Sequence, residues 1–120
     1  MNYKKFILFI FFAINSNTYA NDEYAYLSLL TPQRNAECYI AIYRTELNYN
    51  SQGIEIPKYY PPLRKAYQNT VFKQLGSDKA LELIRAISGD LDAKYPVTRQ
   101  DPYAFEKFAE RRALECINYL

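Results

Sequence analysis

Apolar residues recur at steps of three and four along most of the chain, and each such stretch predicts a helix. The first begins at Pro32 and runs to about Tyr49, with Thr31 placed to cap it and Pro32 in its first turn. Its apolar face is wide and comprises Ala36, Cys38, Tyr39, Ile40, Ala41, Ile42, Tyr43 and Leu47. A face of this width predicts a helix at the centre of the fold, where several neighbours can cover it.

Three more helices are predicted after it. One opens at Pro62 and ends at Leu75, before Gly76, a residue suited to the left-handed conformation that terminates helices. The next follows a cap at Ser77 and contains Gly89 near its end. The last follows Asp101-Pro102, a cap-and-proline signal, and has the clearest amphipathic pattern in the chain. A short first turn capped by Asp22 precedes all of them.

Two stretches break the helical pattern. Residues 50–62 contain Pro57, Pro61 and Pro62, which bar a continuous helix, and residues 92–100 form a predicted loop centred on Tyr95-Pro96. The only strand-like alternation is the short run Ile54-Glu55-Ile56. The expected fold is therefore all-α, a compact bundle of four to five helices.

The first twenty residues have a different pattern. Lys4 and Lys5 precede nine apolar residues, and the segment ends in Thr18-Tyr19-Ala20. This predicts a secretory signal peptide at residues 1–20, cleaved after Ala20, with residues 21–120 forming one helical domain in the periplasm. The alternative, an uncleaved membrane anchor, needs about 20 apolar residues. We therefore expect no membrane attachment after cleavage.

Removal of the leader changes the net charge of the chain, and export places its cysteines in an oxidising compartment. Lys4 and Lys5 belong to the leader, so the mature chain has 13 basic and 13 acidic residues, which disfavours nucleic acid as a partner. Cys38 and Cys116 would meet in an oxidising compartment, where a structural disulfide is expected. Loop-closure entropy assigns such a cross-link about 4.5 kcal/mol. The alternative is a pair of free, reactive thiols.

Candidate chemistry is sparse. The chain has no His, which removes the commonest general base and a common zinc ligand. Its three Gly residues form no phosphate-binding loop, and Asp90 and Asp92 are expected to be solvated carboxylates near a helix end. The sequence therefore predicts no catalytic residue, no metal site and no cofactor, and a protein that is not an enzyme.

Tyrosine is abundant, with 13 residues in the chain. Tyr39, Tyr43 and Tyr67 lie on helix faces and are predicted to be half-buried at the edge of the core. Tyr59, Tyr60 and Tyr95 stand beside prolines in predicted loops. For these three, contact with a partner and a plain surface position are both open interpretations, because Tyr offers a large contact area with a polar tip.

Two cysteine-containing runs resemble a known family. In Cys38-Tyr39-Ile40-Ala41-Ile42-Tyr43-Arg44, the Cys is followed five residues on by Tyr and then by a basic residue. This run and Glu115-Cys116-Ile117-Asn118-Tyr119 resemble the two cysteine helices of the type VI secretion amidase immunity proteins. The helix around Leu83-Ile84 and the Tyr95-Pro96 loop follow in the family's order. Two features differ from the family pattern: a Trp near Tyr67 is missing, and residues 50–62 are rich in proline.

The resemblance implies a periplasmic, all-helical protein, often a homodimer. Such a protein would bind a secreted peptidoglycan amidase effector and inhibit it by occluding its active-site cleft. The candidate contact residues are those of the predicted loop region, Asp90, Asp92, Lys94, Tyr95 and Arg99, and the tyrosines Tyr59 and Tyr60 of the proline-rich segment. That the loop is only a surface connection remains an alternative. For the whole protein, the alternatives are a small periplasmic stress or chaperone-like binding protein, and a cofactor carrier or enzyme.

Overall fold

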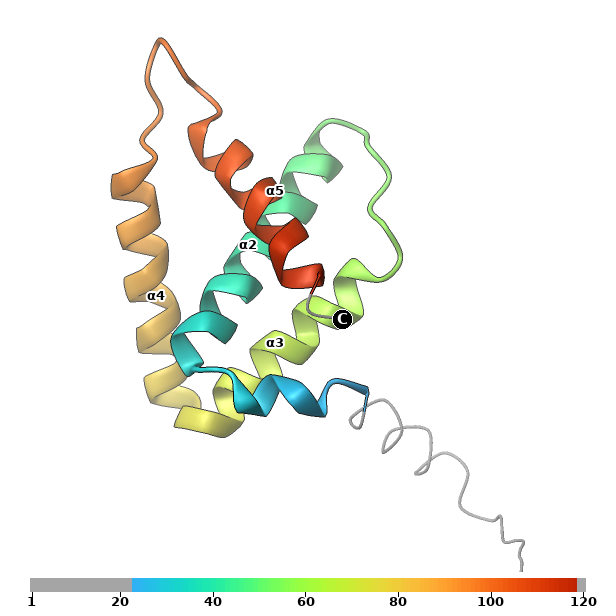
Figure 1. Cartoon of the computed structure of the whole chain (residues 1–120). Helices are drawn as coiled ribbons and strands as arrows, with labels where there is room; N and C mark the ends of the chain where they lie inside the picture. The colour runs from blue at the N-terminus through green and yellow to red at the C-terminus, as the bar shows by residue number, and fades with distance from the viewer. Residues whose placement is uncertain (1–22, 119–120) are drawn as a thin grey trace, which may run out of the picture.

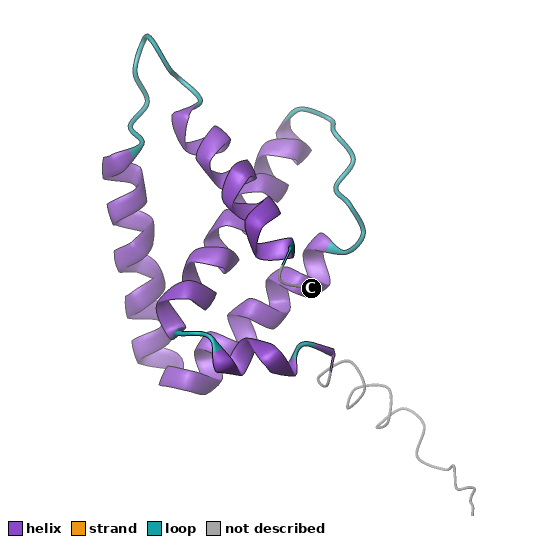
Figure 2. Ribbon diagram, viewed as in Figure 1, coloured by secondary structure: helices purple, strands orange, loops and turns teal. Residues whose placement is uncertain are grey.

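A computed structural model describes residues 23–118, and within that range every regular element is a helix (Figures 1 and 2). A 3₁₀ helix, η1 (Ala25–Leu29), precedes four α-helices: α2 (Pro32–Ser51), α3 (Tyr60–Leu75), α4 (Ser77–Lys94) and α5 (Ala104–Ile117). The predicted all-α bundle is confirmed. The predicted signal peptide and the proposed cap Asp22 lie outside the described residues. Within residues 23–118, no helix has both the length and the apolar character needed to cross a bilayer.

Helix α2 is the central element, as its wide apolar face predicts. Thr31 caps it by accepting a hydrogen bond from the backbone N–H of Arg34 at 3.1 Å, and Pro32 occupies the first turn. Helices α3, α4 and α5 all pack against α2, whereas α4 and α5 have little backbone contact with each other. Figure 1 shows α4 and α5 joined at one end by their connecting segment and spreading apart away from it, with α5 lying across α2.

Three helix boundaries differ from the sequence-based expectation. Helix α4 continues through Gly89 to Lys94, because burial of Leu91 against α2 and α5 outweighs the low helix propensity of glycine. The N-cap of α4 is Gly76, with φ of 84°, so Ser77 is the first helical residue and not the cap. Helix α3 starts at Tyr60, with Pro61 and Pro62 inside its first turn.

Helix α5 also begins later than the Asp101-Pro102 signal predicts. Its first residue is Ala104, and Tyr103, at the N-cap position, makes no side-chain capping bond. Asp101 is held elsewhere: its backbone N–H donates to Thr98 Oγ1 at 3.0 Å, and its carboxylate pairs with Lys107 at 3.0 Å. Because its N–H bonds to Thr98 and its carboxylate pairs with the side chain of Lys107, Asp101 lies in a turn of its own, and α5 starts at Ala104.

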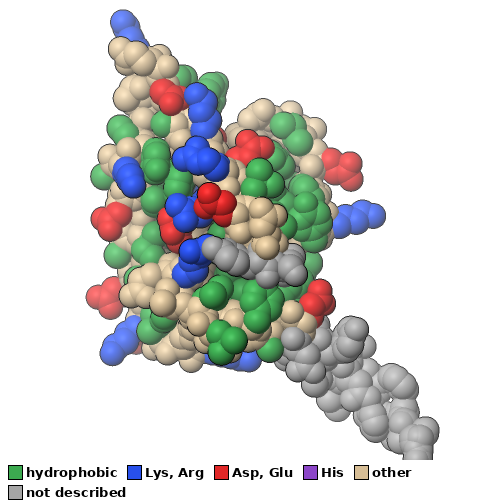
Figure 3. Space-filling view, viewed as in Figure 1, with side chains coloured by type: hydrophobic (Ala, Val, Ile, Leu, Met, Phe, Trp, Pro, Cys, Tyr) green, Lys and Arg blue, Asp and Glu red, His purple; other side chains and the backbone are tan. Residues whose placement is uncertain are grey.

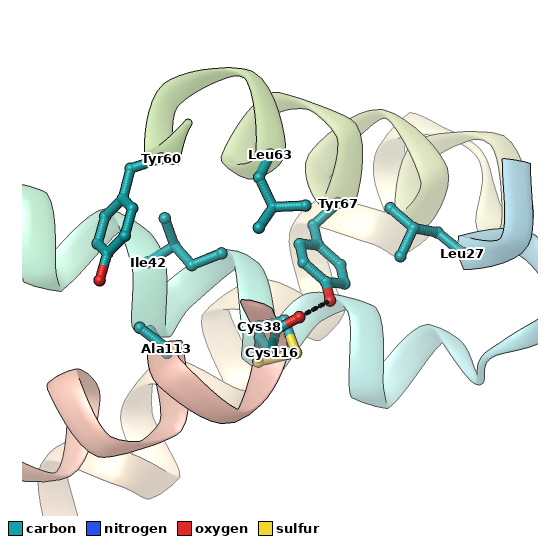
Figure 4. Close-up of a cluster of buried hydrophobic side chains, with 9 residues drawn as sticks. Leu27, Cys38, Ile42, Tyr60, Leu63, Tyr67, Ala113 and Cys116 are labelled. Carbon is teal, nitrogen blue, oxygen red and sulfur yellow. Dashed lines mark hydrogen bonds between the residues drawn. A yellow bond between two sulfur atoms is a disulfide. The ribbon is translucent and has the colours of Figure 1, made fainter. Parts of the chain in front are cut away.

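The main hydrophobic core surrounds a disulfide between Cys38 and Cys116, with a Cα–Cα distance of 5.8 Å (Figure 4). The predicted cross-link is therefore present, and it joins α2 to α5. Tyr67 of α3 is fully buried beside it and donates a hydrogen bond from its hydroxyl to the backbone carbonyl of Cys116 at 2.9 Å. The prediction of a half-buried Tyr67 was wrong, since this ring fills the centre of the core. The other buried members of this cluster are Leu27, Ala41, Ile42, Tyr60, Leu63 and Ala113.

The η1 segment is attached to the bundle by two amide side chains. Asn35 of α2 is fully buried, and its Nδ2 donates to the carbonyl of Leu27 at 3.0 Å and to Gln74 Oε1 at 3.1 Å. Gln74 of α3 in turn donates to the carbonyl of Leu30 at 2.8 Å. The carbonyl of Leu27 also accepts the backbone N–H of Leu30, so Asn35 is its second donor. The two amide side chains together hold η1, and with it Leu27, against the core.

Removal of the disulfide is expected to cost most of the stability of the fold. The bond closes a sequence separation of 78 residues, for which loop entropy gives about 4.5 kcal/mol as an upper figure. We expect the urea midpoint of the mature protein to fall sharply when reductant is added. The Cys38→Ala/Cys116→Ala variant should match the reduced protein and be insensitive to reductant. Equal midpoints for oxidised and reduced protein would contradict this role.

Tyr67→Phe should destabilise the protein by about 1–2 kcal/mol at neutral pH, because the carbonyl of Cys116 loses its buried donor. Burial raises the pKa of Tyr67 in the folded state above the ordinary value. Above pH ~10 the unfolded wild type releases this proton while the folded state retains it, so wild-type stability falls with pH by about 1.4 kcal/mol per unit more than that of the variant.

The stability gap between wild type and Tyr67→Phe is therefore expected to narrow as pH rises above about 10. Urea unfolding at a series of pH values measures it. Tyr43→Phe, which removes an exposed hydroxyl, is the control and should leave neutral-pH stability unchanged. A constant gap across the alkaline range would show that Tyr67 does not stay protonated in the fold.

Candidate functional site

The connection between α4 and α5, residues 95–103, is largely exposed, and we call it the tip. Val97 is 81% exposed and Tyr103 is 61% exposed, although both side chains are large and apolar. Figure 1 shows the tip extending beyond the ends of the other helices. Apolar side chains held in water at the end of a projection are typical of a surface that meets another molecule.

The structure divides the predicted loop residues between a helix and the tip. Asp90, Asp92 and Lys94 belong to the last turns of α4, so the prediction that residues 92–94 lie in a loop was wrong. Arg99 lies in the tip, and its side chain is exposed, as are the three α4 side chains. Of the five candidates, only Tyr95 and Arg99 therefore belong to the tip, whereas Asp90, Asp92 and Lys94 lie on the helix that leads to it.

Tyr95 anchors the tip and does not extend from it. Its ring stacks on Phe108 of α5 with centroids 4.6 Å apart and an interplanar angle of 18°. Its backbone N–H donates to the carbonyl of Leu91 at 2.9 Å, which ends α4. The half-buried ring therefore joins the end of α4 to the first turns of α5. Any contact of Tyr95 with a partner involves the rim of the ring and its hydroxyl.

Further contacts restrain the rest of the tip. The bonds of Asp101 to Thr98 and Lys107 close a small turn within it. Pro96 and Pro102 fix φ near both ends and reduce the number of conformations open to the backbone. The exposed groups Val97 and Arg99 thus lie on a short segment with restraints on both sides.

Charge around the tip is mixed. Lys94 and Arg99 are basic, whereas Asp90, Asp92 and Asp101 are acidic. Figure 3 shows acidic and basic groups interspersed with apolar ones along the part of the molecule that narrows towards the tip. No single sign of charge dominates this face, so recognition here would rest on shape, apolar contact and individual ion pairs.

The second predicted contact region is separate from the tip. Figure 1 shows residues 52–59 and the tip as two distinct projections. Tyr59 is 50% exposed, but Tyr60 is only 2% exposed and belongs to the main core. The hypothesis that Tyr60 contacts a partner is therefore not supported by its position. Its ring lies between Tyr59, at 5.3 Å, and Tyr49, at 6.4 Å, and burial raises its pKa.

Tyr49 closes this tyrosine cluster by bonding to α5. Its hydroxyl donates to Glu110 Oε2 at 2.5 Å, and this bond is the main cause of the raised pKa of Tyr49. The tyrosines of residues 49–60 therefore serve largely to pack the start of α3 against the end of α2. Only Tyr59 of this group presents a large ring to solvent.

A groove of about 470 Å³ lies between η1 and α3. It is lined by Tyr24, Ala25, Ser28, Ala66, Asn69, Thr70, Lys73 and Gln74. Lys73 is the single charged side chain among these lining residues. Among residues 23–118, no three Cys, Asp or Glu side chains converge in a way that could hold a metal ion.

Sequence reasoning missed two exposed apolar groups at the tip, Val97 and Tyr103. Each directly follows a proline and lies outside any apolar stripe. This combination is visible in the sequence and could have marked both residues as exposed. It also missed the exposed pair Tyr43 and Leu47, at 41% and 48%, because their helical spacing resembles that of core residues.

Comparisons with protein-family models, with curated proteins and with solved structures find no match for this chain. The fold and the exposure of the tip are therefore the observations on which a functional proposal can be built.

Proposed function

We propose that this protein is a periplasmic immunity protein that binds a type VI secreted peptidoglycan amidase and blocks its active-site cleft with the tip. The observation that carries the proposal is the tip itself, an exposed, restrained projection on a disulfide-linked bundle. The family resemblance of the two cysteine runs supplies the class of partner. The signal-like residues 1–20 supply the compartment in which such an amidase would act.

The geometry of the tip suits a concave target. An enzyme cleft is concave, so an inhibitor that fills it needs a convex element narrow enough to enter. Residues 95–103 form such an element, and Val97 provides an apolar group for a pocket while Arg99 provides a charge for an acidic rim. Restraint at both ends lowers the entropy lost on binding, which raises affinity without further contacts.

The proposal needs no reactive group on the inhibitor. Inhibition by occlusion depends on a stable scaffold, and the disulfide and the buried core around it provide one. The resemblance also implies that two copies associate, which sedimentation of the mature protein would measure. A stress or chaperone-like role is the competing proposal, and it predicts suppression of aggregation of unrelated unfolded proteins and no effect on an amidase.

Val97→Asp should weaken inhibition of the cognate amidase about 10- to 100-fold, because a charge replaces an apolar group at the centre of the contact. Stability should be unchanged, since Val97 is 81% exposed. Titration of amidase activity against purified peptidoglycan gives the inhibition constant. Leu29→Asp is the matched control, because Leu29 is 85% exposed and lies in η1, away from the tip.

Equal inhibition by the wild type and Val97→Asp would exclude the tip as the contact. Absence of inhibition by the wild type against amidases of this class, together with protection of unfolded client proteins, would favour the chaperone-like role.

A further inference from the structure

We infer that Arg44 is the positioning residue of the tip, because one side chain of α2 holds the end of α4 and the start of α5 at the same time. Its guanidinium carbon lies 4.0 Å from the centroid of the Phe105 ring on α5. Its Nη2 lies 3.8 Å from Asp92 Oδ1 on α4. The expected effect of Arg44 on binding rests on the proposed function, whereas its expected effect on the rigidity of the tip in the free protein does not.

A tie of this kind matters because α4 and α5 share few close backbone contacts and meet mainly through side chains, with Leu91 of α4 against Phe105 and Phe108 of α5. Each helix also packs on α2, and residues 95–103 connect their ends. The position of the tip therefore depends on how firmly each helix end is fixed to α2. Side-chain contacts from α2 fix both helix ends, together with the ring stack of Tyr95 on Phe108.

Arg44 lies at the end nearest the tip of an apolar layer between α2, α4 and α5. Ile40, one turn earlier on α2, is buried among Leu91 of α4 and Phe105 and Phe108 of α5. Arg44 extends this row by one turn and lies over the face of Phe105, which is 5% exposed. A guanidinium suits this place because it can stack flat on a ring while its N–H groups face a carboxylate at the edge.

The Arg44 contacts differ from the other arginine contacts of the bundle. Arg112 is a close match in chemistry: it lies 5.5 Å from the Phe108 ring and pairs with Glu37 and Glu115. Its side chain is 30% exposed, against 35% for Arg44. Arg112 contacts residues of α2 and of its own helix, α5, but none of these contacts reaches α4. Arg44 contacts both α5 and α4. Arg112→Met is therefore the matched control.

The experiment compares Arg44→Met, Arg44→Lys and Arg112→Met in the mature, oxidised protein. Hydrogen exchange followed by mass spectrometry reports opening of peptides that cover residues 91–106. Arg44→Met should speed exchange there about three- to tenfold while leaving the peptides around the disulfide unchanged. Arg44→Lys keeps the charge facing Asp92 but loses the flat stack, so it should give a smaller increase. Arg112→Met should leave the tip peptides unchanged.

Binding to the amidase provides the second readout. The dissociation rate should rise for Arg44→Met by a factor similar to that seen in exchange, and it should stay unchanged for Arg112→Met. Tip exchange equal to that of wild type in both Arg44 variants would overturn the inference, as would equal effects of the Arg44 and Arg112 variants. If the wild type binds no amidase, the exchange result still decides the role of Arg44, and only the proposed function fails.

Discussion

The bond between Cys38 and Cys116 is the constraint on which the arrangement of the helices depends. It fixes α2 and α5, whose cysteines are 78 residues apart, at a single point in the core. The hydroxyl of Tyr67 reaches the carbonyl of Cys116 at the same point and adds α3. Ala109 and Ala113 of α5 are fully buried, and their small side chains allow α5 to lie close to α2. Three helices are thus held within one small volume.

The position of α2 explains why the tip exists. Its buried residues belong to three separate clusters: Cys38 and Ile42 to the main core, Ile40 to the layer with α4 and α5, and Ala36 to a third with α3 and α4. Because α2 offers apolar groups in several directions, the other helices gather around it. Helices α4 and α5 each meet α2, and the largely exposed residues 95–103 connect their ends. A projecting connection is a consequence of this packing.

The main core and the proposed contact surface lie in different parts of the molecule. The disulfide and the main core lie where α2, α3 and α5 meet, whereas the tip extends from the ends of α4 and α5. A substitution at an exposed tip residue such as Val97 therefore leaves the core contacts intact. Arg44 and the stack of Tyr95 on Phe108 are the contacts that transmit the rigidity of the bundle to this surface.

The sequence by itself determined the helical class, the central role of α2, the cap at Thr31 and the pairing of the cysteines. These follow from local periodicity, from one capping bond and from the presence of only two thiols, all of which can be read along the chain. Helix ends were less predictable, because α4 continues to Lys94 and ends beside Tyr95, whose ring stacks on Phe108 of α5, and no local pattern shows such a contact.

Only the tertiary structure decided which aromatic residues are buried and which side chains hold the tip. Tyr60 and Tyr67 are buried and Tyr59 is exposed, although the sequence gives no local sign that separates them. The contacts of Arg44 with Phe105 and Asp92 join residues more than forty positions apart. Such contacts depend on the relative placement of three helices. Periodicity states which face of a helix is apolar, but it does not state which neighbour will cover that face.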